Sequence, residues 1–475
     1  MHAQTVPSIF HAPHAHHASP MRRLSRRCDI DGGVTTGDDG VRHRLGGRRR
    51  SRKGLFRRRV AALHADDDTG ESEGERRRGT RNNVVGPSPS ELGLDRTGGG
   101  SLFCFGLGYT SLGLVSTLRR AGWQVAGTCR SEERVASFAA AGVEAHLWRP
   151  DDGVGLSSEG MRALMNATHV LSSVPPVGDF DRDPVLADAA CVDALVASAA
   201  AASPGRFPAN TTTTTTTTRT LRWVGYLSST GVYGDKGGSW VDENTVPVPV
   251  SPKGIARYAA EEAWRDLFDL HGVPVEVFRL GGIYGPGRSI LDTVLAKNAA
   301  ATRSRASRVT GGGAVGTGSG TGTNGDGGGG GTESRSQRAR GSRKFTSRCH
   351  VGDVVAVLCA SMSRRAAEEQ GDDDDNNGLA AATATTMRVY NVVDDEPAPR
   401  ADAAAYARKL LNIEGDDVDG DVAGDVAGGE AEGTARGEKR VRNDKIKDEL
   451  GVQLLYPTYR EGLSAIAAGD MTPFE

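Results

Sequence analysis

The sequence predicts an α/β fold in which a parallel β-sheet is covered by helices on both faces, the doubly wound arrangement. Short apolar segments typical of buried strands alternate along the chain with longer segments of helical periodicity. One apolar segment ends in a glycine-rich turn that opens a helical segment. Segments of low complexity interrupt this alternation without changing its order. Strands separated by helices favour a parallel sheet, because each helix returns the chain across the sheet.

The predicted strands and helices alternate along the chain in a fixed order. Strands are predicted at residues 102–106, 123–129, 144–148, 169–174, 223–229, 274–280 and 388–393. Helices are predicted between the first six strands at residues 110–121, 131–141, 156–166, 184–202 and 251–271. Right-handed crossovers in such a sheet place a ligand at the carboxyl ends of the strands.

The composition limits the globular part of the chain. Gly contributes 64 of the 475 residues and hydrophobic residues only 37%, so long stretches lack the side chains for a core. We expect a disordered leader at residues 1–98, a sheet domain at 99–300 and a small C-terminal substrate-side region at 344–475, which contains the late strand. Long disordered inserts are predicted at residues 301–343, 366–386 and 413–437, with a threonine run at 211–218.

Charge and cysteine content argue against several classes of partner. A formal net charge of −2 gives no electrostatic reason to expect a nucleic acid. No apolar run reaches the roughly 18 residues of a membrane-spanning helix, so no membrane partner is expected. The six cysteines form no Cys-x-x-Cys pair, which predicts free thiols in a reducing compartment and no metal site.

The first part of the chain has the composition of a targeting segment. Residues 1–28 contain no Asp or Glu but several Arg, Ser and His residues, which is typical of an organellar transit peptide. Arg-rich blocks at 48–53 and 57–59 continue this character. Binding of nucleic acid by the Arg blocks is the alternative. We favour a cleaved or disordered leader, because an acidic stretch follows the blocks.

The glycine turn after the first strand predicts a dinucleotide site. Gly106 and Gly108 are followed by Tyr109 and Thr110, and Ser111 takes the third position of the usual Gly-x-Gly-x-x-Gly pattern. Exposed backbone N–H groups and the helix dipole favour a pyrophosphate at such a turn, as in Rossmann domains. A purely structural glycine turn is the alternative.

The end of the second strand favours NADP over NAD. An acidic residue after the second strand would bind the ribose 2′-hydroxyl of NAD, but this chain has Arg130 and Ser131 there. Arg130 can pair with a 2′-phosphate, and Ser131 can cap the next helix and reach the same group. An ordinary exposed Arg130 is the alternative, so NAD stays possible. Ser173 and Val174, after the fourth strand, either face the cofactor or only shape a loop.

Several segments resemble the extended, sugar-nucleotide epimerase-like branch of the short-chain dehydrogenase/reductase superfamily. The resemblance covers residues 101–297 and 344–411, with a tail at 443–463. The segments that carry it are Leu227–Gly234, Arg279–Gly287, Arg348–Asp353 and Tyr390–Asp394. The resemblance implies that Ser229 occupies the position of the catalytic hydroxyl.

One departure from this family concerns proton transfer. The resemblance implies a Tyr-x-x-x-Lys pair on the helix after Ser229, but Lys253 and Arg257 stand at those positions. Tyr258 lies about 100° further around the helix, so it is a poor substitute. Arg257 can bind a ribose or phosphate but cannot shuttle a proton. Lys253 can act as acid or base only if its pKa is depressed. Alternatively, Arg257 pairs with Glu261 on the helix surface.

These residues support two functional hypotheses. The first is an NADP-dependent oxidoreductase or epimerase/dehydratase-like enzyme with Ser229, Lys253 and Tyr233 at the reacting centre. Its small-molecule substrate would lie near three residues of the later segments, Tyr284, Arg288 and His350. The second is a catalytically silent dinucleotide-binding protein, which the missing Tyr suggests. A Rossmann enzyme for another nucleotide is a third reading.

The resemblance also suggests two properties that concern the whole molecule. Extended relatives often dimerise through helices that include the one with Lys253, so a homodimer is expected. Relatives in photosynthetic eukaryotes are often plastid proteins, which favours a plastid over a mitochondrion as the destination of the leader. A cytoplasmic location is expected if the leader is not a transit peptide.

Overall fold

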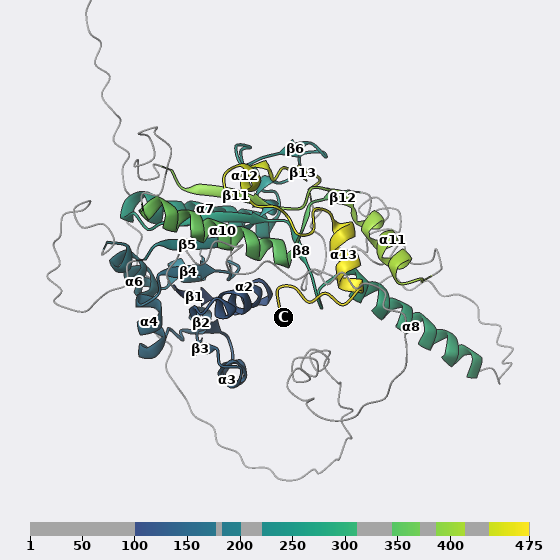
Figure 1. Ribbon diagram of the computed structural model, residues 1–475, viewed down its shortest axis with the longest axis horizontal. Helices are drawn as coiled ribbons and strands as arrows, with labels where there is room; N and C mark the ends of the chain where they lie inside the picture. Colours follow the sequence, from purple (N-terminus) through teal and green to yellow (C-terminus); the bar gives the residue numbers. More distant parts are fainter. Residues whose placement is uncertain are drawn as a thin grey trace, which may run out of the picture. The chain divides into compact units, whose positions relative to one another are not determined.

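The computed structural model describes residues 100–176, 183–200, 221–310, 344–370, 386–413 and 437–474 (Figure 1). The leader at 1–98, the threonine run and most of each predicted insert lie outside these residues, so transit-peptide and plastid assignments stay predictions. No helix among the described residues is long and apolar enough to cross a membrane.

The centre of the structure is a parallel sheet of seven strands. In sequence order these are β1 (Ser101–Phe105), β2 (Gln124–Cys129), β3 (Glu144–Leu147), β4 (His169–Ser172), β5 (Trp223–Ser229), β7 (Val275–Leu280) and β11 (Arg388–Val392). Their order across the sheet is β3-β2-β1-β4-β5-β7-β11, and every neighbouring pair is parallel. The crossover between β1 and β4 divides the sheet into two halves. This confirms the predicted doubly wound Rossmann sheet.

Helices cover both faces of the sheet, which is why the central strands are buried on both sides. Every residue of β1 and β7 is buried. One hydrophobic cluster joins the sheet to α2 (Tyr109–Arg120) and α10 (Val351–Gln370). A second cluster joins the opposite face to α4 (Ser158–Met165), α6 (Ala189–Ala200) and α7 (Pro252–His271).

The predicted helix at 184–202 is two helices, α5 (Pro184–Ala187) and α6. Asp188 separates them, because it adopts an extended conformation and its carboxylate accepts the N–H of Cys191 and the indole N–H of Trp148. The latter contact comes from a distant segment. The remaining helices are α3 (Glu132–Ala140), α8 (Ile290–Thr310), α11 (Arg400–Leu410), α12 (Asp444–Asp448) and α13 (Tyr459–Ala467).

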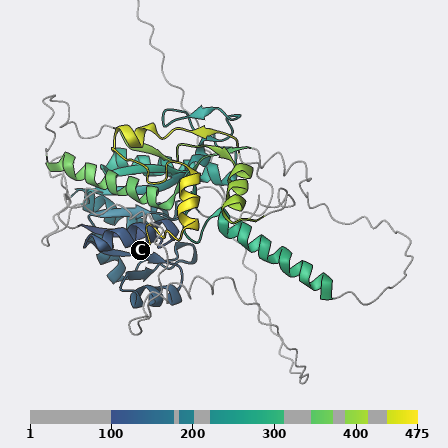
Figure 2. The same cartoon turned by 45° about the vertical axis from the view of Figure 1, so that its right-hand side comes forward.

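Two insert boundaries were wrong. Helix α8 continues to Thr310, ten residues into the segment predicted as a disordered insert from 301, and in both views it extends away from the sheet (Figure 2). Helix α10 likewise continues to Gln370, past the predicted boundary at 366.

Short strand pairs lie beyond the carboxyl edge of the sheet, and two of them join the segment after residue 344 to earlier parts of the chain. Strand β8 (Gly282–Tyr284) pairs with β10 (Arg348–His350), and β9 (Phe345–Thr346) pairs with β12 (Ala398–Pro399). Strand β6 (Trp240–Val241) pairs with β13 (Arg440–Val441). Helices α8, α11 and α13 share a small hydrophobic cluster there.

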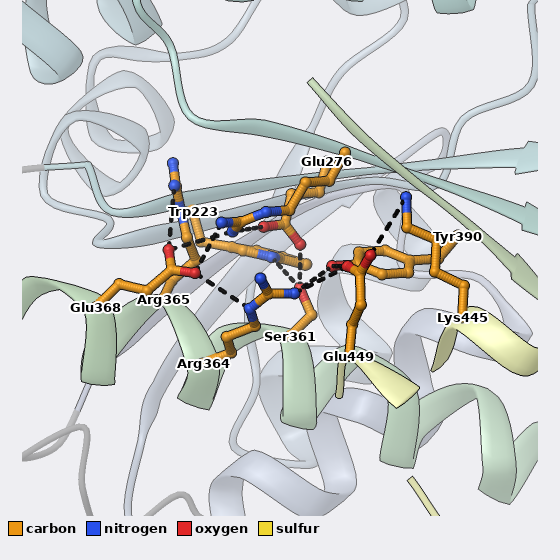
Figure 3. Close-up of polar contacts among 10 residues, drawn as sticks. Trp223, Glu276, Ser361, Arg364, Arg365, Glu368, Tyr390, Lys445 and Glu449 are labelled. Carbon is orange, nitrogen blue, oxygen red and sulfur yellow. Dashed lines mark hydrogen bonds and ion pairs between the residues drawn. The ribbon is translucent and has the colours of Figure 1, made fainter. Parts of the chain in front are cut away.

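A polar network ties α10 to the sheet, as Figure 3 shows. Glu276 on β7 pairs with Arg388 on β11 at 3.3 Å, and Arg388 also pairs with Glu368 on α10 at 2.7 Å. Ser361 donates to Glu276 and accepts the indole N–H of Trp223 at 2.8 Å. These contacts join three strands and one helix near the amino ends of the strands, away from the carboxyl edge where a ligand is predicted.

Candidate functional site

The glycine turn after β1 is held in place by the neighbouring strands. Gly106 has φ +88°, a conformation that favours glycine. Its N–H donates to the Thr128 hydroxyl at 2.8 Å, and its carbonyl accepts the Ser173 hydroxyl at 2.7 Å. The backbone N–H of Leu107 donates to the Thr128 carbonyl at 2.8 Å. The carboxyl ends of β2 and β4 therefore fix this turn from both sides.

The start of α2 forms an open cradle next to this turn. Gly108 is the N-cap of α2, and no side chain caps the helix there. A Cβ added at Gly108 would have no heavy atom within 4 Å. Uncapped N–H groups and the helix dipole make such a site suitable for an anion. The open space and the uncapped helix start at residues 108–110 fit the pyrophosphate of a dinucleotide.

Ser111 and Ser173 lie behind the turn. Ser111 is fully buried and donates to the Ser173 hydroxyl at 2.8 Å. Ser173 in turn donates to the Gly106 carbonyl. Val174 packs on the same side of the turn, because a Cβ added at Gly106 would lie 3.6 Å from Cγ2 of Val174. Ser111 and Ser173 were predicted to bind the cofactor, but these contacts make them supports of the glycine turn.

The end of β2 carries an exposed basic group. Arg130 is 66% exposed and pairs with Asp151 at 3.3 Å. Ser131 accepts the N–H of Arg134 and caps α3, which confirms the predicted cap. Arg134, which was not predicted, donates from its guanidinium to the Leu107 carbonyl in the glycine turn at 2.7 Å. The sequence indicated this role of Arg134 only through the position of the residue, in the first turn of the helix after β2.

Ser229 ends β5 and begins a short 3₁₀ turn, Thr230–Tyr233. Its hydroxyl oxygen accepts the N–H of Gly231 at 3.1 Å. A serine hydroxyl has one proton and two lone pairs, so this contact leaves the proton available for donation. The half-buried Ser229 therefore keeps the capacity to bind an oxygen of a ligand at the carboxyl edge.

Tyr233 is not placed for the proton-transfer role that the sequence suggested. Its side chain is fully buried, and its hydroxyl donates to Asn391 at 2.8 Å. The same oxygen accepts a guanidinium N–H of Arg279 at 3.0 Å. Burial raises the pKa of Tyr233 to about 12. The hydroxyl is thus part of an internal network, where it orders the turn after Ser229.

Lys253 and Arg257 lie one turn apart at the start of α7, and Lys253 is exposed. The Arg257 guanidinium donates to the Leu227 carbonyl on β5 and lies 6.0 Å from the Tyr226 ring. The alternative surface pair of Arg257 with Glu261 is wrong, because Glu261 is fully buried and pairs with Arg279 at 2.7 Å. Arg257 therefore points toward β5, two residues before Ser229.

The three predicted substrate residues lie on two neighbouring segments. Arg288 stands over the Tyr109 ring at 5.4 Å, next to the glycine turn. Tyr284 is buried and contacts His350 edge to face at 5.3 Å. Nδ1 of His350 accepts the N–H of Gly352 at 3.1 Å, and burial lowers its pKa to about 4. His350 is therefore neutral at physiological pH, with its proton on Nε2.

A second polar group on this side was missed from the sequence. Asp394, two residues after the end of β11, is 1% exposed, and neither carboxylate oxygen has a hydrogen-bond partner among the described residues. One terminal nitrogen of Arg348 and the buried Tyr459 hydroxyl also lack partners there, and the Arg348 guanidinium lies 5.4 Å from the Tyr459 ring. Burial raises the pKa of Asp394, while Arg348 opposes this change. Buried polar atoms without partners indicate a place for a ligand or water.

Among the described residues, no group of three or more His, Cys, Asp or Glu side chains lies close enough together to hold a metal ion.

Comparison with known proteins gives one matching family. The sequence model of the NAD dependent epimerase/dehydratase family matches residues 114–373. Protein YeeZ of Escherichia coli strain K12 is 31% identical over 183 residues, which are 38% of this chain and 58% of YeeZ. The chain thus matches less than two thirds of that curated relative.

Two solved structures are also similar to the chain. A conserved protein of unknown function from Silicibacter pomeroyi DSS is 34% identical, with a TM-score of 0.49, over 78% of this chain and all of that protein. A putative NAD-dependent epimerase/dehydratase from Methylobacillus flagellatus is 20% identical, with a TM-score of 0.46, over 78% of this chain and 98% of that protein.

Proposed function

Because the chain belongs to the NAD dependent epimerase/dehydratase family, we propose that it is an NADP-dependent epimerase/dehydratase-like enzyme acting on a small hydroxyl-bearing substrate. The family supports a nicotinamide dinucleotide as the cofactor, which would supply hydride transfer when bound. The single observation that carries the proposal is the open, uncapped start of α2 at Gly108, beside a turn fixed by its neighbours. No side chain of the described residues takes the place that a pyrophosphate requires.

The preference for NADP rests on the charge at the end of β2. Arg130 directly follows β2, at the position where Rossmann domains bind the ribose. It is 66% exposed, and its contact with Asp151, which is 41% exposed, is easily exchanged. A 2′-phosphate offers a stronger, bidentate partner to the same guanidinium. Arg134 adds a second guanidinium close to the turn, although its contact with the Leu107 carbonyl fixes it as a support.

Arg130→Ala is expected to weaken NADPH binding about tenfold and to leave NADH binding unchanged, because a charge-assisted hydrogen bond at an exposed site contributes about 1.5 kcal/mol. The measurement is a fluorescence titration of each reduced cofactor. Arg442→Ala is the matched control, since Arg442 is 54% exposed and pairs with Asp444 at 3.5 Å. Equal affinity of the unaltered protein for NADPH and NADH would show that the NADP preference is wrong.

The reacting groups in this proposal are Ser229 and Lys253. Ser229 keeps its hydroxyl proton for a substrate oxygen, while its lone pair holds the Gly231 N–H. Lys253, in the first turn of α7, would exchange the substrate proton in place of the family's Tyr once bound cofactor and substrate cover this exposed side chain. Without cofactor, the hydrogen bond from Arg257 to the Leu227 carbonyl fixes α7 against β5. Arg257 would exchange this partner for a cofactor hydroxyl when the cofactor binds. Tyr233 orders the turn and takes no part in proton transfer.

The substrate side supports a ligand that both donates and accepts hydrogen bonds. Register pairs Ser229 with Leu280 on β7, and Leu280 with Val392 on β11. Asp394 follows two residues later, and its N–H donates to the Arg348 carbonyl at 2.6 Å. A carboxylate accepts from hydroxyl groups and a guanidinium donates to them. The orphaned atoms of Asp394, Arg348 and Tyr459 are therefore suited to a polyhydroxy compound such as the sugar of a sugar nucleotide.

Conversion of a sugar nucleotide is expected to fall about 100-fold in Ser229→Ala, because positioned proton donors contribute on this scale. The assay incubates the purified protein and NADP with a panel of sugar nucleotides and follows each sugar by NMR. Ser158→Ala, an exposed serine at the start of α4, is the control. The alternative, a catalytically silent dinucleotide-binding protein, predicts tight NADPH binding and no conversion of any panel member. The replacement of the family's Tyr by Lys253 is the observation that favours it.

A further inference from the structure

The last described segment of the chain, residues 470–474, crosses two helices and ends beside the glycine turn. It follows α13, and in Figure 1 the end of the chain lies next to α2. Asp470 anchors its start, since its carboxylate accepts the Tyr456 hydroxyl at 2.6 Å and the N–H of Thr472 at 2.8 Å. Thr472 is buried and would lie 3.3 Å from a Cβ at Gly352, at the start of α10.

Pro473 approaches α2 so closely that only glycine fits opposite it. A Cβ added at Gly113 would lie 2.7 Å from Cγ of Pro473 and 3.2 Å from Cγ2 of Val355. Gly113 has no unusual backbone conformation, so its dihedral angles do not require glycine. The glycine two residues after Ser111 therefore serves the contact between α2 and the 470–474 segment, and not the turn itself.

Phe474 packs on the residue that follows the cradle glycine. Its ring centroid lies 5.2 Å from that of Tyr109, at an interplanar angle of 48°. Arg288 also contacts the Tyr109 ring, and the Tyr109 hydroxyl donates to the Pro286 carbonyl at 3.1 Å. Tyr109 is the first residue of α2, next to the N-cap Gly108. Two distant segments, 286–288 and 470–474, thus meet on the residue that begins the anion cradle.

We propose that the 470–474 segment is part of the dinucleotide site and that Phe474 is a positioning residue, acting through Tyr109 on the first turn of α2. The inference rests on the proposed function. The Phe474 ring packs on the Tyr109 ring, and the Pro286 carbonyl accepts the Tyr109 hydroxyl. The N–H groups at the helix start then need no ordering when a pyrophosphate binds, and such preorganisation increases affinity. Without Phe474, the first turn of α2 must be ordered when the dinucleotide binds, which lowers the affinity.

The test uses the full chain and NADPH as the probe. Phe474→Ala is expected to raise the Kd for NADPH about fivefold, mainly through faster dissociation, since aromatic pairs contribute on this scale. Phe474→Tyr should restore the affinity. Met165→Ala, at the end of α4 and 40% exposed, should leave it unchanged. Amide hydrogen exchange at residues 109–111 should be faster in Phe474→Ala before any cofactor is added, while the thermal midpoint stays within a few degrees.

Two different negative results separate the inference from the proposed function. If the unaltered protein binds NADPH and Phe474→Ala binds it equally well, the inference is wrong and the proposed function stands. If the unaltered protein binds neither NADPH nor NADH, both are wrong. If Phe474→Ala does not fold, Phe474→Leu is measured instead. This variant keeps an apolar contact without the ring and should weaken NADPH binding about twofold.

Discussion

Gly108→Asp is expected to abolish dinucleotide binding, with a Kd raised at least about 100-fold, while the protein becomes slightly more stable. Gly108 has φ −95° and ψ −171°, an extended conformation that suits an N-cap aspartate, and a Cβ there meets no atom within 4 Å. The new carboxylate would bind the N–H groups of the first turn of α2, for a gain of about 0.5 kcal/mol. It would also occupy the position of the pyrophosphate, and its negative charge would repel the phosphate groups.

The opposite signs of the two effects make this variant informative. Affinity is measured by NADPH fluorescence and stability by urea unfolding. Gly155→Asp is the matched control, because Gly155 is exposed, also has open space around its Cβ position and does not start a helix. It adds the same charge and should leave the affinity for NADPH unchanged. Unaltered binding by Gly108→Asp would mean that the start of α2 is not the anion site.

Arg279→Met is expected to lower the free energy of unfolding by about 3–5 kcal/mol, because it leaves a buried carboxylate without its charge partner. Arg279 and Glu261 are 3% and 0% exposed and pair at 2.7 Å. Glu261 also accepts the Ser228 hydroxyl, and Arg279 donates to the Tyr233 hydroxyl. The ion pair thus connects α7 and β7 to both sides of Ser229.

The control for Arg279→Met is a variant of an ion pair that has the same distance between its charged atoms but more exposed side chains. Arg460 pairs with Glu396 at 2.7 Å, but the two side chains are 45% and 33% exposed. Arg460→Met should cost less than about 1 kcal/mol, since water screens exposed pairs. Urea unfolding of both variants measures the difference. Equal losses in the two variants would show that burial does not set the contribution of the Arg279 pair.

Much of the sheet was predictable because its determinants are local. The apolar runs and the helical periodicities gave every strand of the central sheet to within two residues at each end, and β5 at both ends. The single predicted helix at 184–202 was wrong at Asp188, where a contact with Trp148 from another segment helps to end the helix. Periodicity carries no information about such a contact.

Only the local geometry of the candidate site was predictable. The glycine turn at Gly106 and the helix cap by Ser131 were predicted correctly, because a turn and a cap depend on neighbouring residues. Tyr233 was misassigned because its partners, Arg279 and Asn391, are 46 and 158 residues away. Asp394 was missed for a related reason, since its burial depends on segments that are brought together only by the fold.

The order of the strands has a consequence for how the sheet is completed during folding. Strand β7 lies between β5, about 50 residues earlier, and β11, which pairs Arg388 with Glu276 across 112 residues of sequence. The entropy of loop closure delays contacts between distant segments. We therefore expect β11 to dock last, after the six earlier strands have assembled. Until then β7 is an open edge, with hydrogen-bonding groups available to other chains. Docking of β11 and formation of its ion pairs with Glu276 and Glu368 would close that edge against aggregation.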